Sequence, residues 1–115
     1  MAITIFHNPR CSKSRATLAL LEERGLEPTI RLYLENPPDA EELRGILRKL
    51  GLTPRELMRT GEAEYKELGL ADPALDDARL VEAMTTHPRL IERPIVLAGR
   101  KAAIGRPPES VLAIL

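Results

Sequence analysis

The sequence predicts one α/β domain in which two small sheet-forming halves are separated by a helical insertion. Three observations lead to this expectation. The chain has 115 residues, a size at which one compact domain is usual. Short β-prone runs lie near both ends of the chain. Between them, residues 36–90 carry the apolar spacing and capping residues that are typical of helices.

The first half is expected to form a strand, a helix and a second strand. Residues 3–6 are β-prone, and residues 28–34 contain alternating apolar side chains, so each run should form a strand. Residues 12–24 have an apolar face, and Gly25 follows them as a helix-ending residue. Two strands joined by one helix are expected to be parallel.

The middle and the last part of the chain complete the pattern. Asp39, Thr53 and Asp76 stand where helices should begin, and Thr53 opens a capping box with proline at the first helical position. Residues 95–97 and 102–104 should form an antiparallel hairpin, followed by a final helix with apolar positions at Val111, Leu112 and Leu115. This order, β-α-β then β-β-α, is the thioredoxin-like arrangement of a mixed sheet. We therefore expect one thioredoxin-like domain over residues 1–115, with a helical insert at about 36–90.

Composition excludes several classes of protein. No apolar run approaches the ~20 residues that a membrane-spanning helix needs, and residues 1–6 are too short for a signal-peptide core. We therefore expect a cytoplasmic protein with no membrane partner. The chain has one Phe, two Tyr and no Trp, which leaves few rings for base stacking. Direct binding of nucleic acid is therefore not expected.

The single cysteine, Cys11, restricts the redox and metal chemistry that the chain can perform. It excludes an internal disulfide, and it leaves too few soft ligands for a structural zinc site. We expect no bound metal or cofactor. If Cys11 takes part in redox chemistry, the second thiol must come from another molecule.

The position of Cys11 favours a reactive thiolate. It lies between a predicted strand and a predicted helix, and a helix N-terminus offers free N–H groups and partial positive charge. Arg10, Lys13 and Arg15 lie close in sequence, and His7 and Ser14 are candidates to hydrogen-bond the sulfur. Such settings lower a cysteine pKa and also bind oxyanions. The alternative is a buried cysteine that packs as a small apolar side chain.

Positive charge gathers at the two ends of the chain. Residues 1–21 and residues 89–115 each sum to +3, while residues 22–88 sum to −6. If the ends meet in space, they produce a positive field suited to a small anion. Uneven surface charge without a function is the alternative.

Three arginines are candidates to bind one tetrahedral anion, because a guanidinium group binds oxyanions through paired N–H groups. Arg93 and Pro94 precede the strand at 95–97, where a thioredoxin-like fold places a cis proline beside the active cysteine. The alternative is a trans proline at the start of an edge strand. Arg106 precedes Pro107, and Arg59 ends a short predicted helix. Taken singly, each arginine could equally be a solvated or ion-paired surface residue.

Three segments together resemble the glutaredoxin-linked arsenate reductase family. They are residues 7–15 (His-Asn-Pro-Arg-Cys-Ser-Lys-Ser-Arg), residues 32–38 (Leu-Tyr-Leu-Glu-Asn-Pro-Pro) and residues 93–96 (Arg-Pro-Ile-Val). The resemblance extends from about residue 3 to the C-terminus, helical insert included. Any one of these motifs would be weak, but their combination at this spacing is specific.

The resemblance implies that the chain reduces arsenate to arsenite and contributes to arsenic resistance. It places the catalytic nucleophile at Cys11, and it places supporting side chains at His7 and Ser14. The arginines that bind the substrate fall at Arg59, Arg93 and Arg106. Glutathione is the implied cosubstrate, and glutaredoxin is the implied partner that removes the remaining mixed disulfide. A single cysteine agrees with this scheme, since glutathione replaces an internal second thiol.

The motif departs from the family pattern in one place. Established reductases of this family tend to have Gly-Thr after the cysteine, whereas this chain has Ser12 and Lys13. The Cys-Ser-Lys-Ser motif resembles that of a variant branch of the family. Loss of the glycine restricts the loop around the anion, and Lys13 adds positive charge.

Two other functions are compatible with the fold. One is a glutathione-linked thiol reductase that uses Cys11 on a substrate other than arsenate. The other is a regulator similar to Spx, which binds RNA polymerase without catalysis. Redox-switched members of that group carry Cys-x-x-Cys, and here the fourth position is Ser14. The sequence leaves the oligomeric state open.

Overall fold

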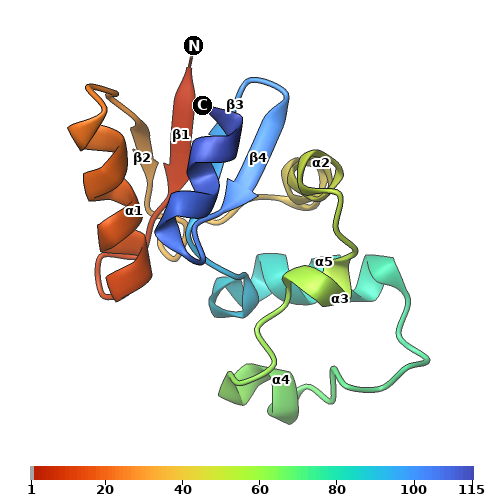
Figure 1. The fold of residues 1–115 in the computed structure, drawn as a ribbon. Helices are drawn as coiled ribbons and strands as arrows, with labels where there is room; N and C mark the ends of the chain where they lie inside the picture. Colours follow the sequence, from red (N-terminus) through yellow and green to blue (C-terminus); the bar gives the residue numbers. More distant parts are fainter. Residues whose placement is uncertain (1) are drawn as a thin grey trace. The chain divides into compact units, whose positions relative to one another are not determined.

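The computed structural model describes residues 2–115 and divides them into two compact units. The first unit combines residues 2–36 with residues 93–115 and contains the sheet. The second unit, residues 37–92, consists of helices and their connections (Figure 1). The sequence pattern thus assigns the β-prone ends of the chain to one unit and the amphipathic middle to another.

The sheet is mixed and has the order β2-β1-β3-β4. Its strands are β1 (Ile3–Phe6), β2 (Thr29–Arg31), β3 (Ile95–Ala98) and β4 (Lys101–Ile104). β1 is parallel to β2 and antiparallel to β3, and β3 and β4 form an antiparallel hairpin. The expected parallel pair and C-terminal hairpin are therefore confirmed, and the sheet is thioredoxin-like.

The second strand is shorter than the alternating apolar pattern predicts. We expected residues 28–34, but β2 ends at Arg31. The backbone turns at Leu32, whose carbonyl accepts hydrogen bonds from the N–H groups of Glu35 and Asn36 at 3.0 and 2.9 Å. Leu32 and Leu34 therefore lie in a turn and are each 38% exposed. Their alternation does not reflect a buried face of a strand.

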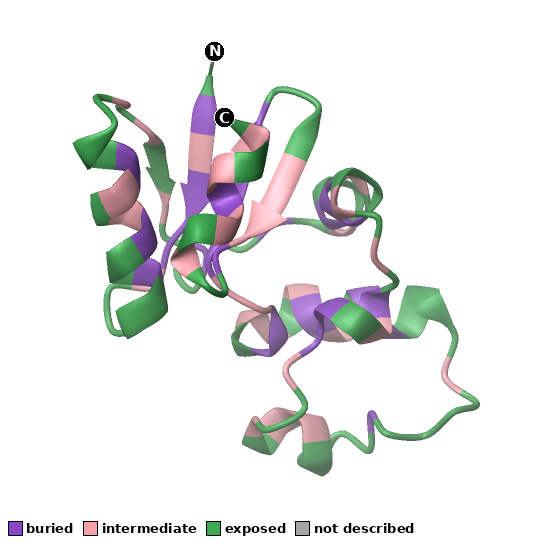
Figure 2. Ribbon diagram, in the orientation of Figure 1, coloured by how far each residue is buried: buried purple, intermediate pink, exposed green. Residues whose placement is uncertain are grey.

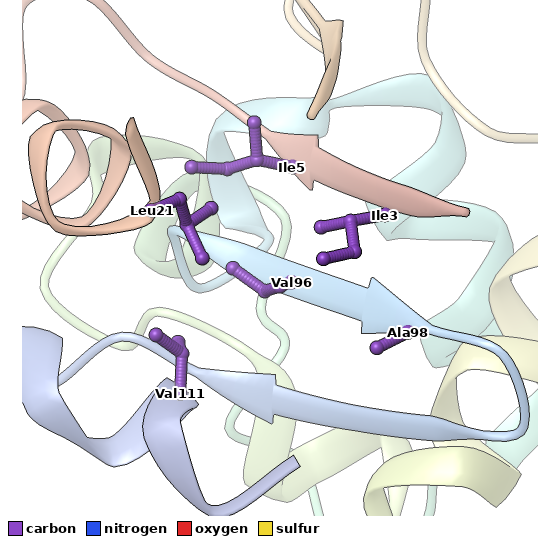
Figure 3. Close-up of a cluster of buried hydrophobic side chains, with 6 residues drawn as sticks. All are labelled: Ile3, Ile5, Leu21, Val96, Ala98 and Val111. Atoms are coloured by element: carbon purple, nitrogen blue, oxygen red, sulfur yellow. The ribbon is translucent and has the colours of Figure 1, made fainter. Parts of the chain in front are cut away.

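One face of the sheet is covered by α1 (Ser12–Glu23) and by the C-terminal segment η2 (Pro108–Ile114). Their apolar side chains pack on those of β1 and β3 (Figure 3). The fully or almost fully buried members of this cluster are Ile3, Ile5, Leu21, Val96, Ala98 and Val111. The burial pattern places the inner sides of α1 and β1 against this core (Figure 2).

The C-terminal segment is a 3₁₀ helix, not the α-helix that we expected. A 3₁₀ helix has three residues per turn, so side chains at positions i and i+3 align. Val111 and Ile114 both pack on the sheet core, whereas Leu115 is 38% exposed. Of the three apolar positions that we expected to be buried, Val111 is buried, Leu112 is partly buried and Leu115 is exposed.

The opposite face of the sheet holds an aromatic pair. Phe6 and Tyr33 are each about 1% exposed, and their rings stack with centroids 6.2 Å apart. The guanidinium carbon of Arg31 lies 5.2 Å from the centre of the Phe6 ring, a cation–π distance. This contact fixes the end of β1 just before the loop that carries the cysteine.

The helical unit begins its helices where the sequence places the capping residues. It contains α2 (Ala40–Leu50), α3 (Pro54–Leu57), α4 (Ala63–Glu67), α5 (Asp77–Thr86) and the short 3₁₀ helix η1 (Pro88–Leu90). Asp39 and Asp76 cap α2 and α5, and Thr53 forms the expected capping box. α2 and α3 pack on α5, and their buried side chains include Leu43, Ile46, Leu57, Leu80, Val81 and Met84.

No helix in residues 2–115 combines the length and the apolar character that are needed to cross a bilayer.

We predict that Ile5→Ala destabilises the chain by about 2–5 kcal/mol, because it leaves a cavity in the sheet core. Ile5 is completely buried in the cluster under α1. Its register partner Ile30 is 47% exposed on the edge strand β2. Ile30→Ala is the matched control and should cost about 1 kcal/mol or less. Urea unfolding of both variants measures the difference, and equal losses would contradict the assignment of the core.

Candidate active site

The loop between β1 and α1 is organised by its own polar groups. The side-chain oxygen of Asn8 accepts a hydrogen bond from the Arg10 N–H at 3.0 Å. The N–H of Cys11 donates to the Asn8 carbonyl at 3.0 Å. Arg15 Nη1 donates to the Pro9 carbonyl at 2.8 Å. These contacts hold Cys11 at the N-cap of α1, in extended conformation, where the helix begins.

Cys11 is buried at this helix start, and its thiolate is stabilised there. Its residue is only 8% exposed. Burial by itself raises the pKa of Cys11, since desolvation disfavours the charged form. The N–H of Ser14, the Arg93 side chain and the N–H of Lys13 stabilise the thiolate more strongly, and the net pKa is below the ordinary thiol value. The geometry favours a reactive cysteine over a purely structural one.

The basic side chains next to Cys11 in sequence contribute less than expected to the low pKa of Cys11. Two backbone N–H groups lower the pKa of Cys11, and so does Arg93, which is distant in sequence. Arg10 and Lys13 have exposed side chains, where water screens their charge. Arg15 is engaged with the Pro9 carbonyl. The helix start and tertiary contacts, more than local sequence charge, therefore make this thiol acidic.

His7 and Ser14 form a buried pair beneath the loop. His7 Nδ1 lies 2.7 Å from the Ser14 hydroxyl, which also accepts a hydrogen bond from the Asn8 N–H at 3.0 Å. Burial and the nearby charge of Arg15 lower the pKa of His7, so the imidazole is neutral at pH 7. A neutral Nδ1 can accept the Ser14 proton. The Ser14 hydroxyl thus connects the loop to α1. The backbone N–H of Ser14 donates a hydrogen bond to the Cys11 sulfur.

The structure brings Arg93 and Arg106 to Cys11. Arg93 hydrogen-bonds the thiolate, and Nη2 of Arg106 donates to Cys11 Sγ at 3.8 Å. Nε of Arg106 also donates to the Arg93 carbonyl at 2.8 Å. The Arg93–Pro94 peptide is cis, as expected, and Arg106–Pro107 is a second cis bond that the sequence did not suggest to us. Two guanidinium groups, one from the segment before β3 and one from the segment after β4, thus lie beside one sulfur.

Arg59 lies in the helical unit and is bound to carboxylates of that unit. Its Nη1 is 2.6 Å from Glu92 Oε1, and its Nε is 3.6 Å from Glu62 Oε1. Its N–H donates to the Leu90 carbonyl at 2.7 Å, next to a bridge between Met58 and Ile91. The structure therefore fixes Arg59 at a crossing of two segments. Its predicted role in binding an anion stays a prediction.

Asn8 is a residue of this site that the sequence analysis did not single out. It contributes its N–H, its carbonyl and its side-chain oxygen to the loop, with Ser14, Cys11 and Arg10 as partners. Asn followed by Pro is a turn signal. That dipeptide could have pointed to a structured loop before the cysteine.

A pocket of about 230 Å³ adjoins the same loop. It is lined by residues of the loop and of the turn after β2, namely His7, Asn8, Pro9, Arg10, Leu32, Leu34 and Glu35. Within residues 2–115, no group of three or more His, Cys, Asp or Glu side chains is arranged to hold a metal ion. The site as described therefore offers a thiolate, N–H groups and guanidinium groups, which suit an oxyanion.

Comparisons with known proteins agree with this chemistry. A model described as the ArsC family matches residues 6–114. The chain is 58% identical to "Uncharacterized protein YfgD" of Escherichia coli K12, over 98% of this chain and 96% of that protein. It is 57% identical to an arsenate reductase of Neisseria meningitidis, over 98% and 97%. A solved arsenate reductase structure from Vibrio cholerae matches with TM-score 0.98 and 53% identity, over 100% and 98%.

We predict that Arg93→Ala raises the pKa of Cys11, because it removes a hydrogen bond and a positive charge from the thiolate. The pH dependence of alkylation by iodoacetamide measures this pKa, since only the thiolate reacts. The midpoint should lie below the ordinary thiol value in the wild type and move to higher pH in the variant. Lys101→Ala, which removes an exposed charge from β4, is the control and should leave the midpoint in place. An unmoved midpoint in Arg93→Ala would remove Arg93 from the sulfur site.

Proposed function

The chain belongs to the ArsC family, and from that membership we propose that it reduces arsenate to arsenite through the Cys11 thiolate. Relatives named arsenate reductases, including ones at 53% and 57% identity, support the reaction. The arrangement of Cys11 supports the mechanism. A buried, acidic thiol with two guanidinium groups beside it combines a nucleophile and a site for its oxyanion substrate.

The first step is attack of the Cys11 thiolate on the arsenic atom. An S–As bond forms, and one arsenate oxygen leaves as water after it takes up protons. The N–H groups of Lys13 and Ser14 at the start of α1 and the guanidinium groups of Arg93 and Arg106 lie beside the sulfur. They stabilise the charge on the remaining oxygens as the bond forms.

The reduction needs two electrons, and when a disulfide forms each of the two thiols supplies one. The chain has a single cysteine, so the second thiol comes from another molecule. We propose glutathione in this role. Its sulfur bonds to Cys11 Sγ as the S–As bond breaks, arsenic(V) leaves as arsenic(III), and the two sulfurs are oxidised to a mixed disulfide. The presence of only one cysteine in the chain is the observation that most directly supports an external thiol.

Glutaredoxin then regenerates the enzyme in the proposed cycle. Its thiolate attacks the glutathione sulfur of the mixed disulfide, and Cys11 leaves as a thiolate. The low pKa of Cys11 makes it a good leaving group. The pocket of about 230 Å³ beside the cysteine loop offers space for the peptide part of a thiol cosubstrate.

We further propose that Arg59 is the third group that binds arsenate, as the family resemblance implies. Glu92 and Glu62 neutralise Arg59 in the structure. Binding of an anion would exchange these carboxylate contacts for contacts with arsenate oxygens. The ion pairs keep the guanidinium group oriented until that exchange.

Turnover with the complete thiol system tests the proposed function. NADPH oxidation is followed with glutathione, glutaredoxin and glutathione reductase, with and without arsenate. We expect arsenate-dependent oxidation that Cys11→Ser abolishes, since the nucleophile is lost. Ser12→Ala is a matched control on an exposed neighbour.

The outcomes of this assay separate the alternatives. Arsenite formation that persists without glutathione, measured directly, would contradict glutathione as the second thiol. Absence of turnover with a reactive, acidic Cys11 would contradict arsenate as the substrate and favour another thiol substrate. Absence of turnover together with specific binding to the RNA polymerase α subunit would favour a regulator.

Arg59→Ala should raise the arsenate KM roughly tenfold to a hundredfold, equivalent to about 1.5–3 kcal/mol for a charged hydrogen bond. Arg89→Ala is the matched control. Arg89 lies in the same unit, contacts the same Glu62 and is 62% exposed, and its loss should leave the KM within about twofold. Equal effects of the two variants would argue that Arg59 acts only through the stability of the helical unit.

A further inference from the structure

Among the described glycines, Gly105 has the least space for a side chain, because side-chain atoms of Thr17 and Pro94 lie against its Cα. It lies between β4 and Arg106, and its N–H donates to the Pro94 carbonyl at 2.9 Å. A Cβ added here would collide with Thr17 Oγ1 and would lie 2.8 Å from Pro94 Cγ and 3.1 Å from Thr17 Cγ2. Gly25, Gly51, Gly69 and Gly99 have positive φ angles, but Gly105 does not. Close approach, not backbone conformation, therefore requires a glycine at position 105.

The groups that face Gly105 have little freedom to move away. Thr17 is completely buried in α1, and its hydroxyl donates to the Lys13 carbonyl at 2.8 Å. Rotation of the Thr17 side chain would break that hydrogen bond. Pro94 is a buried ring, with its carbonyl bound to the Gly105 N–H. A side chain at position 105 must therefore displace the backbone after β4 or α1 itself.

Such a displacement would act on the contact between Arg106 and the sulfur. Thr17 lies on the helix whose N-cap is Cys11, and Gly105 directly precedes Arg106. The Gly105–Thr17 contact thus sets the distance between the backbone of Arg106 and the helix of the nucleophile. Arg106 Nη2 reaches Cys11 Sγ at 3.8 Å, and this contact depends on that distance.

We propose that Gly105 is a positioning residue of the active site, whose missing side chain lets Arg106 reach the Cys11 sulfur and the anion bound there. The part that concerns the anion rests on the proposed function. The part that concerns the sulfur stands on the contacts among Gly105, Thr17, Arg106 and Cys11 alone.

Alkylation of Cys11 by iodoacetamide across pH tests the contact with the sulfur without any substrate. Gly105→Ala should move the midpoint to higher pH, because the thiolate loses the Arg106 donor. In an Arg106→Ala background the same substitution should cause no further shift, since the group through which it acts is absent. Gly61→Ala is the control, because a Cβ there meets nothing within 4 Å. A wild-type midpoint in Gly105→Ala, or an equal added shift in the Arg106→Ala background, would overturn the proposal.

Sulfate bound beside Cys11 should protect the sulfur from alkylation by iodoacetamide. The sulfate concentration that gives half protection measures anion affinity independently of turnover. Gly105→Ala should weaken sulfate roughly tenfold or more, the scale for loss of one charged hydrogen bond. Addition of Thr17→Ala removes two of the three colliding atoms and should restore part of this affinity. General destabilisation would not produce such a recovery, and its absence would contradict the steric mechanism.

If Gly105→Ala cannot be purified as a folded protein, the pair Thr17→Ala/Gly105→Ala carries the alkylation test. In this double variant the Cβ at position 105 still lies too close to Pro94 Cγ. The alkylation midpoint of the double variant should therefore lie at higher pH than that of Thr17→Ala alone. Equal midpoints would overturn the proposal. Failure of the wild type to turn over arsenate, with these shifts intact, would count against the proposed function and leave the positioning role standing.

Discussion

The stabilisation of a thiolate at the buried Cys11 sulfur is the constraint around which the first unit is arranged. A thiolate out of water is costly unless donors and positive charge surround it. The chain meets this cost with groups from two sources. Backbone N–H groups of Lys13 and Ser14 come from the start of α1, and the guanidinium groups of Arg93 and Arg106 come from the two ends of the hairpin.

This arrangement explains why the sheet core and the active site cannot be separated. The cluster that contains Ile5, Leu21, Val96 and Val111 clamps α1 and η2 onto one face of the sheet. The same packing sets where α1 begins relative to the ends of β3 and β4. Close contact of Gly105 with Thr17 and Pro94 is the point at which the packing limits the geometry of the site. Small residues at such contacts matter through the space that they leave.

Arg59 illustrates a different way to hold a cation. Arg93 and Arg106 lie against a sulfur and a carbonyl oxygen, whereas Arg59 is held by two glutamates of its own unit. Its charge is neutralised in the structure by these two carboxylates. The middle of the chain is acidic and lies between two basic ends in the sequence. Two acidic residues in or next to this middle stretch, Glu62 and Glu92, form the ion pairs with Arg59.

Local signals in the sequence were sufficient for much of the fold. Asp39, Thr53 and Asp76 cap the helices that they were expected to begin, because an N-cap needs only a side-chain oxygen and the next turn of backbone. The strand at 3–6 and the hairpin near 95–104 followed from β-prone runs in the same way. Leu32, Leu34 and the C-terminal helix were misassigned, because apolar alternation and spacing do not reveal where the backbone turns or how tightly it coils.

The sequence by itself also determined the position of Cys11 at a helix start and the lack of a second cysteine that could pair with it, since both depend on residue order and count. Only the tertiary structure decided which charges reach the sulfur. The neighbours Arg10 and Lys13 remain exposed, while Arg93 and Arg106 arrive from more than 80 residues along the chain. Separation along the chain carries no information about distance in space until the sheet and α1 are packed together.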